Sequence, residues 1–195
     1  MSATQSIHDF SAAPILNRFS ASVEMLELAK KKHNAIDLLD GLVANSDFVG
    51  AFDFLSHWMP PQFAVWWGCL CVWEIQREEQ TPEFNAAMQL IVNWLHAPNE
   101  DQRQSLAQVE QWFSSRHPIG LLTKAAQMSG GSLAPKNCPA VPPPTYLFAL
   151  LVSSSIKLIA MQALATGYSA RCKQILRLGM EVLQGANRWE RSPND

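Results

Sequence analysis

The chain has 195 residues, of which 48% are hydrophobic and 16% are charged, and its formal net charge is −2. This length fits one domain with a substantial core. The low charged fraction fits a soluble protein that gives part of its surface to partners, and a compact all-helical core predicts the same composition. The lack of a basic excess argues against a protein that binds nucleic acid through its phosphates.

The first segment, residues 1–20, is polar, rich in serine and alanine, and weakly patterned. We expect a flexible arm that docks through Ile15, Leu16 and Phe19. The segment lacks the basic start and the apolar stretch of a signal peptide, which favours a cytoplasmic protein.

Helical periodicity begins at Ala21 and continues through most of the chain. The first predicted helices contain Val23, Leu26 and Leu28, then residues 35–44, then residues from an Asn45 or Ser46 cap to Trp58, and then residues 61–77. The later ones cover residues 82–96, 100–115, 118–128, 144–165 and 168–184. Because no segment alternates with a period of two residues, the sequence predicts an all-α protein, a compact bundle of about eight or nine helices.

The segment from Met59 to Ile75 contains a proline pair followed by three tryptophans. Pro61 fits the first turn of a helix, where its missing N–H has no intrahelical partner to lose. At about 100° per residue, only Gln62 and Glu74 interrupt the apolar side chains around the axis. A helix that is apolar on all sides is enclosed by its neighbours, so we place this Trp-rich helix at the centre of the bundle.

Two features of this helix remain open to a functional interpretation. Trp66 and Trp67 point about 100° apart, so one of them can line a groove instead of the core. Glu74 needs a partner such as Arg77, His57 or a helix end, since burial otherwise raises the pKa of a carboxyl. A structural anchor at the end of the helix is the first interpretation, and a carboxylate in a functional pocket is the alternative.

Residues 129–144, with the sequence SGGSLAPKNCPAVPPP, form a long stretch without helical periodicity. Such loops are uncommon in compact chains unless they are functional or disordered. The prolines favour an extended, stiff backbone that a partner can recognise. The other interpretation is a strap that packs over the helices through Leu133 and Val141. A phosphate-binding loop is disfavoured, because residues 130–132 lack the preceding strand and the Gly-Lys-Ser/Thr ending.

No catalytic constellation or metal-binding spacing is found, so we expect no cofactor and no metal. Cys69 and Cys71 point about 200° apart on one helix and cannot share a metal or a disulfide. No Cys-x-x-Cys pair occurs, and no spacing places a histidine beside Cys138. Buried free thiols in a reducing compartment are the expected state. The most membrane-like window, residues 146–165, carries Lys157 at its middle and is better explained as a buried helix.

Two motifs together resemble an uncharacterised bacterial family. They are Met-Pro-Pro-Gln-Phe-Ala-Val-Trp-Trp at residues 59–67, and Ser-Gly-Gly-Ser-Leu-Ala-Pro at residues 129–135 before the proline run 142–144. The family shows a Leu-Pro-Pro-Arg-Glu-Ala-Val-Trp-Trp-like stretch and a Gly-Gly-Ser-Leu-Ala-Pro loop. This chain departs from it at Gln62 and Phe63, which replace a charged pair. The resemblance implies an accessory protein beside bacterial secretion systems, including type VI loci, rather than a metabolic enzyme.

We therefore predict one helical domain over residues 21–187, with residues 1–20 as an arm and residues 188–195 as a frayed tail. The predicted function is that of a non-enzymatic, cytoplasmic interaction protein: an adaptor, chaperone or regulator. A groove between the Trp-rich helix and the loop receives a protein partner or a second copy of the chain. The predicted partner-binding residues are Trp66, Trp67, Glu74, Gly130, Gly131, Ser132, Leu133, Pro135 and Pro142.

Two alternatives stay open. One is an enzyme or small-ligand binder that uses Glu74 and His57, or Cys138, in an apolar pocket. The other is a structural homodimer formed through the last two helices. Neither nucleic-acid binding nor membrane insertion is expected.

Overall fold

The computed structural model describes residues 10–75, 81–134, 137–162 and 167–187. These residues form ten α-helices and one short 3-10 helix, with no β-sheet among them, which confirms the all-α prediction. In chain order the elements are α1 (Ala13–Leu16), α2 (Val23–Ala29), α3 (Ala35–Ala44), α4 (Phe48–Trp58), α5 (Pro61–Ile75), α6 (Pro82–His96), α7 (Glu100–Ser105), η2 (Leu106–Gln111), α8 (Pro118–Gln127), α9 (Leu147–Met161) and α10 (Tyr168–Leu183).

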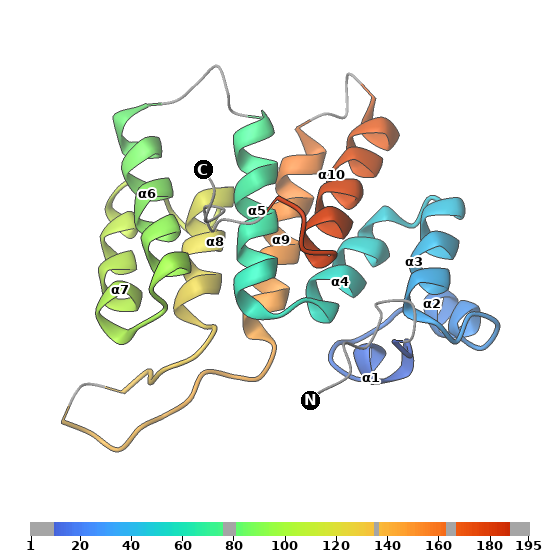
Figure 1. The fold of residues 1–195 in the computed structure, drawn as a ribbon, viewed down its shortest axis with the longest axis horizontal. Helices are drawn as coiled ribbons and strands as arrows, with labels where there is room; N and C mark the ends of the chain where they lie inside the picture. Colours follow the sequence, from blue (N-terminus) through green and yellow to red (C-terminus); the bar gives the residue numbers. More distant parts are fainter. Residues whose placement is uncertain (1–9, 76–80, 135–136, 163–166, 188–195) are drawn as a thin grey trace.

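Helix α5 lies at the centre of the bundle, as its apolar sequence predicts. It contacts α6 and α8 on one side and α9 and α10 on the other (Figure 1). Trp67 has no exposed surface, and its Nε1 donates a hydrogen bond to the backbone oxygen of Ile175 at 2.8 Å. The indole therefore joins α5 to α10 while its one polar atom stays satisfied.

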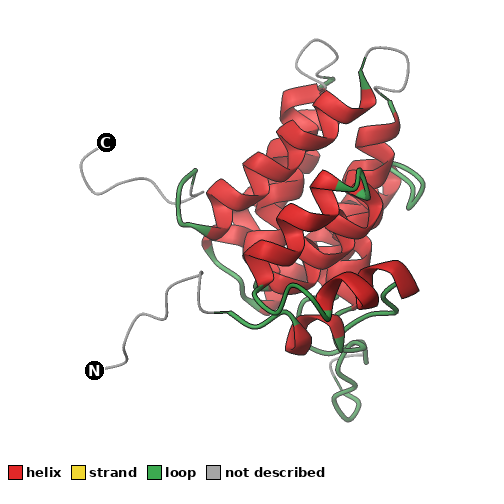
Figure 2. Ribbon diagram, turned by 90° about the vertical axis from the view of Figure 1, so that its right-hand side faces the viewer, coloured by secondary structure: helices red, strands yellow, loops and turns green. Residues whose placement is uncertain are grey.

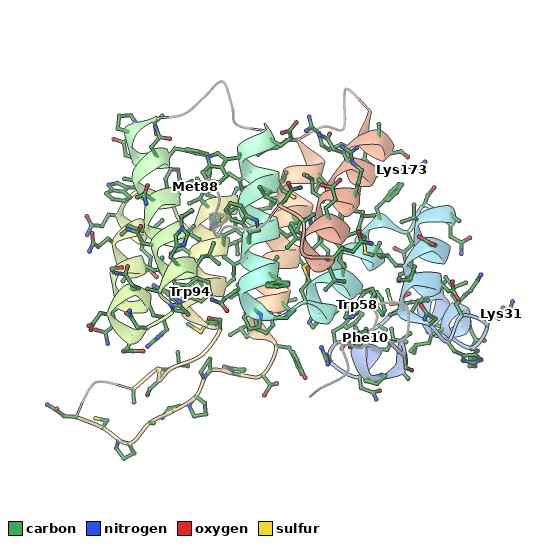
Figure 3. The ribbon with its side chains drawn as sticks, viewed as in Figure 1. Phe10, Lys31, Trp58, Met88, Trp94 and Lys173 are labelled. Atoms are coloured by element: carbon green, nitrogen blue, oxygen red, sulfur yellow. The ribbon has the colours of Figure 1, made fainter. Side chains whose placement is uncertain are left out.

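The long helices pack side by side, and the loop between α8 and α9 extends from one end of the bundle (Figure 2). Helix α6 has the two faces that its sequence predicts: Phe84, Ala87, Met88, Ile91, Trp94 and Leu95 are buried. Figure 3 shows Met88 and Trp94 on this helix. None of the described helices combines the length and the apolarity that a membrane crossing requires.

Residues 10–20, the described part of the predicted arm, are held against the bundle. Among the described residues 10–20, Ile15 and Leu16 are buried and Phe19 packs against the core, so the predicted docking residues do dock. Backbone bonds from Ala12 N to His33 O at 2.9 Å and from Ala35 N to Phe10 O at 2.8 Å fix this segment against the start of α3.

Two details of the early helices differ from prediction. Helix α2 exposes Val23 and Leu26 and buries Met25, because the unbranched Met25 side chain fills the space beside Gly50, where no side chain stands. The cap of α4 is Asp47 and not Asn45 or Ser46: its carboxylate accepts from Gly50 N at 2.9 Å.

Two later elements also differ. Residues 100–115 do not form one α-helix: α7 ends at Ser105 and gives way to the 3-10 helix η2. A period of three stacks Leu106 above Val109, and both are fully buried. Helix α9 begins at Leu147 rather than near Pro144, since Tyr146 adopts a left-handed φ of 62° that a helix cannot continue through.

The contact between α10 and α5 gives a test of the core. A Cβ on Gly179 would lie 2.7 Å from both the Leu55 and the Trp67 side chains. Gly179→Ala should therefore lower the free energy of unfolding by about 1–3 kcal/mol through overpacking, although alanine favours a helix by about 1 kcal/mol.

Gly41→Ala is the matched control, because a Cβ there meets only the half-buried Leu28 side chain, at 3.0 Å. Urea unfolding of the two variants measures both effects. A Gly179→Ala variant as stable as Gly41→Ala would contradict the close packing of α10 on α5.

Candidate functional site

The loop over residues 129–144 projects from the bundle at the end where α5 begins (Figure 1). Leu133 is 45% exposed and Val141 is 51% exposed, so these side chains do not pack over the helices. The backbone N–H of Leu133 instead donates to the oxygen of Val141 at 2.8 Å, which joins the outgoing and returning arms of the loop. The strap interpretation is therefore wrong, and the loop is a projecting finger.

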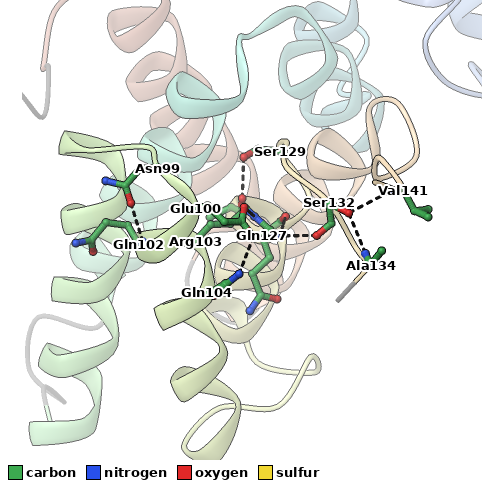
Figure 4. Close-up of polar contacts among 11 residues, drawn as sticks. Asn99, Glu100, Gln102, Arg103, Gln104, Gln127, Ser129, Ser132, Ala134 and Val141 are labelled. Atoms are coloured by element: carbon green, nitrogen blue, oxygen red, sulfur yellow. Dashed lines mark hydrogen bonds and ion pairs between the residues drawn. The ribbon is translucent and has the colours of Figure 1, made fainter. Parts of the chain in front are cut away.

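The base of this finger is closed by Ser132. Its Oγ accepts hydrogen bonds from the backbone N–H groups of Ala134 and Val141, each at 3.0 Å (Figure 4). The Ser132 hydroxyl thus accepts a hydrogen bond from each arm of the finger and holds the two arms together at their base.

Arg103 ties the base of the finger to the bundle. Its side chain is 12% exposed and donates to both carboxylate oxygens of Glu100, at 2.8 and 2.6 Å. The same guanidinium donates to the backbone oxygens of Gln127 at 3.0 Å and Ser132 at 2.8 Å (Figure 4). A guanidinium buried to this extent is stable only when it is paired, and here its partners come from α7, the end of α8 and the finger.

Gly131 makes room for this arrangement. Its φ is +73°, and a Cβ there would lie 2.6 Å from Arg103 Nε and 2.7 Å from Glu100 Oε2. Its neighbour Gly130 has no atom within 4 Å of a built Cβ. Of these two predicted site residues, only Gly131 is required to be glycine.

A pocket of about 400 Å³ lies between the first turn of α5 and the finger. Its walls are Pro61, Gln62, Trp94, Pro98, Asn99, Glu100, Arg103, Ser129, Gly130 and Gly131. This is the place where the sequence predicts a groove, and Gly130 and Gly131 line it. A second pocket of about 560 Å³ includes Ser132 and Leu133 and shares Arg103 and Glu100 with the first. The ion pair therefore forms the wall between the two pockets.

The predicted residues of α5 lie elsewhere. Trp67 is in the core, and Trp66 is 8% exposed, with its Nε1 donating to the backbone oxygen of Asn187. Glu74 accepts a hydrogen bond from Gln174 Nε2 at 3.2 Å. With a rise of about 1.5 Å per residue, Glu74 is roughly 20 Å along α5 from Pro61. It does not meet the finger.

The remaining predicted residues lie in the finger itself. Pro142 is exposed, and Pro135 lies outside the described residues.

Arg103 is a residue of the site that the sequence does not predict. Its spacing from Glu100 indicates an ion pair on one helix, but its other partners are backbone oxygens, which leave no trace in the pattern of side chains.

The residues proposed for a catalytic pocket do not converge either. His57 is near the end of α4, directly before α5 starts, whereas Glu74 is at the opposite end of α5. Cys138 is exposed on the finger, and burial raises the pKa of the Cys69 thiol to about 12. Among the described residues, no group of three histidine, cysteine, aspartate or glutamate side chains is placed to hold a metal ion.

Comparison with known proteins gives one match. The sequence profile of a family described as "Family of unknown function (DUF6931)" matches residues 38–195, which include α4, α5, both pockets and the finger. No curated protein and no solved structure matches the chain.

The two adjacent glycines provide a matched pair of substitutions. Gly131→Ala places a methyl group against Arg103 and forces a left-handed φ on alanine, so it should lower the free energy of unfolding by about 1–3 kcal/mol. Gly130→Ala should change it by less than about 0.5 kcal/mol. Amide hydrogen exchange at Leu133 and Val141 should speed up in Gly131→Ala only. Equal exchange rates in both variants would contradict the assigned base.

The cysteines report on the exposure of the finger. Cys138 is exposed, while Cys69, Cys71 and Cys172 are buried, and burial raises the pKa of each of the three buried thiols. Because the thiolate is the reactive form, dithiodipyridine should modify one thiol per folded chain quickly and the others only on unfolding. A Cys138→Ser variant should lose the fast phase. A fast phase that persists in this variant would show that one of the other three cysteines is accessible, which would contradict their burial.

Proposed function

We propose that this chain, which belongs to the DUF6931 family of unknown function, is a non-enzymatic interaction protein that presents its finger, residues 129–144, to a partner protein. The observation that supports this is the finger's construction. Its base is fixed by partly buried hydrogen bonds of Arg103, while the apolar side chains of Leu133 and Val141 are exposed. An exposed apolar segment that is already ordered loses little conformational entropy on binding.

The composition of the returning arm indicates the chemistry of the partner. Pro139 and Pro142 are exposed and have the spacing Pro-x-x-Pro, and residues 139–144 form neither helix nor turn. Extended segments with this spacing fit grooves lined by aromatic side chains, because proline fixes the backbone in advance. We therefore assign the finger as the ligand and an aromatic-lined groove as the complementary surface.

The two pockets at the base suit the flanks of such an interface. They are lined by apolar and neutral polar groups around the Glu100–Arg103 pair, whose charges compensate each other. A partner that covers them meets no excess charge. The adaptor, chaperone or regulator role, and the setting beside a bacterial secretion system such as type VI, come from the sequence resemblance and belong to the same proposal.

The finger is tested by comparing captured partners among variants of the full chain. Pro139→Ser combined with Pro142→Ser should reduce capture from a lysate of the source organism about tenfold or more, as expected when contacts worth about 1.4 kcal/mol or more are lost. Val23→Ser with Val49→Ser is the matched control, since it alters two exposed apolar residues outside the finger.

The captured protein, once identified by mass spectrometry and purified, is then titrated with the same variants. A finger variant that binds it as tightly as the unmodified chain would sink the proposal. If light scattering shows a dimer that the finger substitutions dissociate, the occupant is a second copy of the chain instead.

A further inference from the structure

A third pocket, of about 360 Å³, lies on another side of the bundle from the pockets around Arg103 and has different chemistry. It lies where the segment after α1, the last turns of α4 and the start of α9 meet, and Pro144, the last residue of the finger, is on its edge. Its charged or titratable walls are Arg18, Asp53, His57 and Lys157. A volume near 300 Å³ or above is in the range of small-molecule sites, which combine apolar walls with a few convergent polar groups.

His57 carries an unused hydrogen-bonding atom. The residue is only 3% exposed, and its Nδ1 lies 2.7 Å from the backbone oxygen of Asp53, one turn earlier in α4. Nδ1 is therefore the donor, and Nε2, on the far side of the ring from that backbone, is an acceptor in the neutral form. Within the described part of the chain, no group donates to Nε2. Burial lowers the pKa of His57, which favours the neutral ring.

The charges around this ring do not cancel. Lys157 Nζ lies 2.6 Å from Asp53 Oδ1, which also accepts from Ser153. Arg18 donates from Nη1 to the backbone oxygen of His57 at 2.7 Å. Two cations against one carboxylate leave one positive charge in excess, which matches a monoanion better than a dianion.

Most of the other walls of the pocket are apolar, although Ser20 and Thr145 also line it. The Phe19 ring stacks on His57 with centroids 4.6 Å apart, and the Arg18 guanidinium lies over the Tyr146 ring at 5.0 Å. Leu150 adds an exposed apolar side chain. Tyr146 lines the pocket from the left-handed backbone conformation described above, with a φ of 62°. Such a strained backbone at a residue other than glycine is found often at functional positions.

We propose that this pocket binds a small hydroxy monocarboxylate. The carboxylate pairs with the guanidinium of Arg18, whose planar fork suits two oxygens of one group. The hydroxyl donates to His57 Nε2, and the hydrocarbon body lies against Phe19, Tyr146 and Leu150. The carboxylate of the ligand balances the excess positive charge of the pocket. The hydroxyl of the ligand donates the hydrogen bond that His57 Nε2 does not receive from the protein.

Calorimetric titration of the full chain with mandelate tests this assignment, with three matched probes. Mandelate should bind saturably with one site per chain. Mandelamide, which lacks the charge, should bind about tenfold more weakly or worse, and phenylacetate, which lacks the hydroxyl, about fivefold more weakly. Inorganic phosphate should compete poorly. No saturable binding of mandelate, equal binding of the amide, or tighter binding of phosphate would each overturn the proposal.

Substitutions locate the site. Arg18→Gln should weaken mandelate about tenfold or more, and Lys173→Gln, which removes one positive charge from an exposed position on α10, should stay within about twofold. Lys173 does not line the pocket, and Figure 3 shows it on α10. Equal effects of the two substitutions would overturn the assigned site. Circular dichroism checks that Arg18→Gln still folds. If it does not fold, the comparison of mandelate, mandelamide and phenylacetate on the unmodified chain still tests the proposal.

Discussion

The apolar surface around all sides of α5 is the constraint on which the rest of the structure depends. Such a helix is stable only when neighbours cover every side of it, and α6, α8, α9 and α10 do so. Because helices complete this enclosure, α5 needs no cover from the loop over residues 129–144. The loop is free to project, and Leu133 and Val141 stay exposed.

A projecting loop needs a fixed base, and Arg103 provides one. Its guanidinium is held by Glu100 and in turn holds two backbone oxygens, at Gln127 and Ser132. The glycine at position 131 allows the backbone to pass close to this pair. The finger and its flanking pockets therefore depend on one ion pair, in which the Arg103 side chain is mostly buried and Glu100 is exposed. The His57 pocket depends instead on the contact of the N-terminal segment with α4 and α9.

Side-chain patterns predict much of this fold. The faces of α6 follow from the periodicity of its apolar residues, and Pro61 and Pro82 mark two helix starts. The predictions that are wrong concern features that tertiary contacts determine. Met25 is buried because its side chain fills the space beside Gly50, and η2 forms because Leu106 stacks on Val109. The sequence singles out the loop over residues 129–144, but the predicted groove residues Trp66, Trp67 and Glu74 do not line the pocket beside it. The sequence does not predict Arg103 or the pocket at His57, because backbone oxygens and residues distant in the chain build both.

The finger is an ordered projection that is held at its base by Arg103 and Ser132. Heteronuclear ¹H–¹⁵N relaxation of the Leu133 and Val141 amides tests it most directly, because these amides lie at the junction of the two arms. The order parameters of these amides should be close to the rigid-backbone value of about 0.85 in the unmodified chain and should fall below about 0.6 in Arg103→Ala. Values below about 0.6 for these amides in the unmodified chain, with rigid helices α8 and α9 on either side, would contradict it.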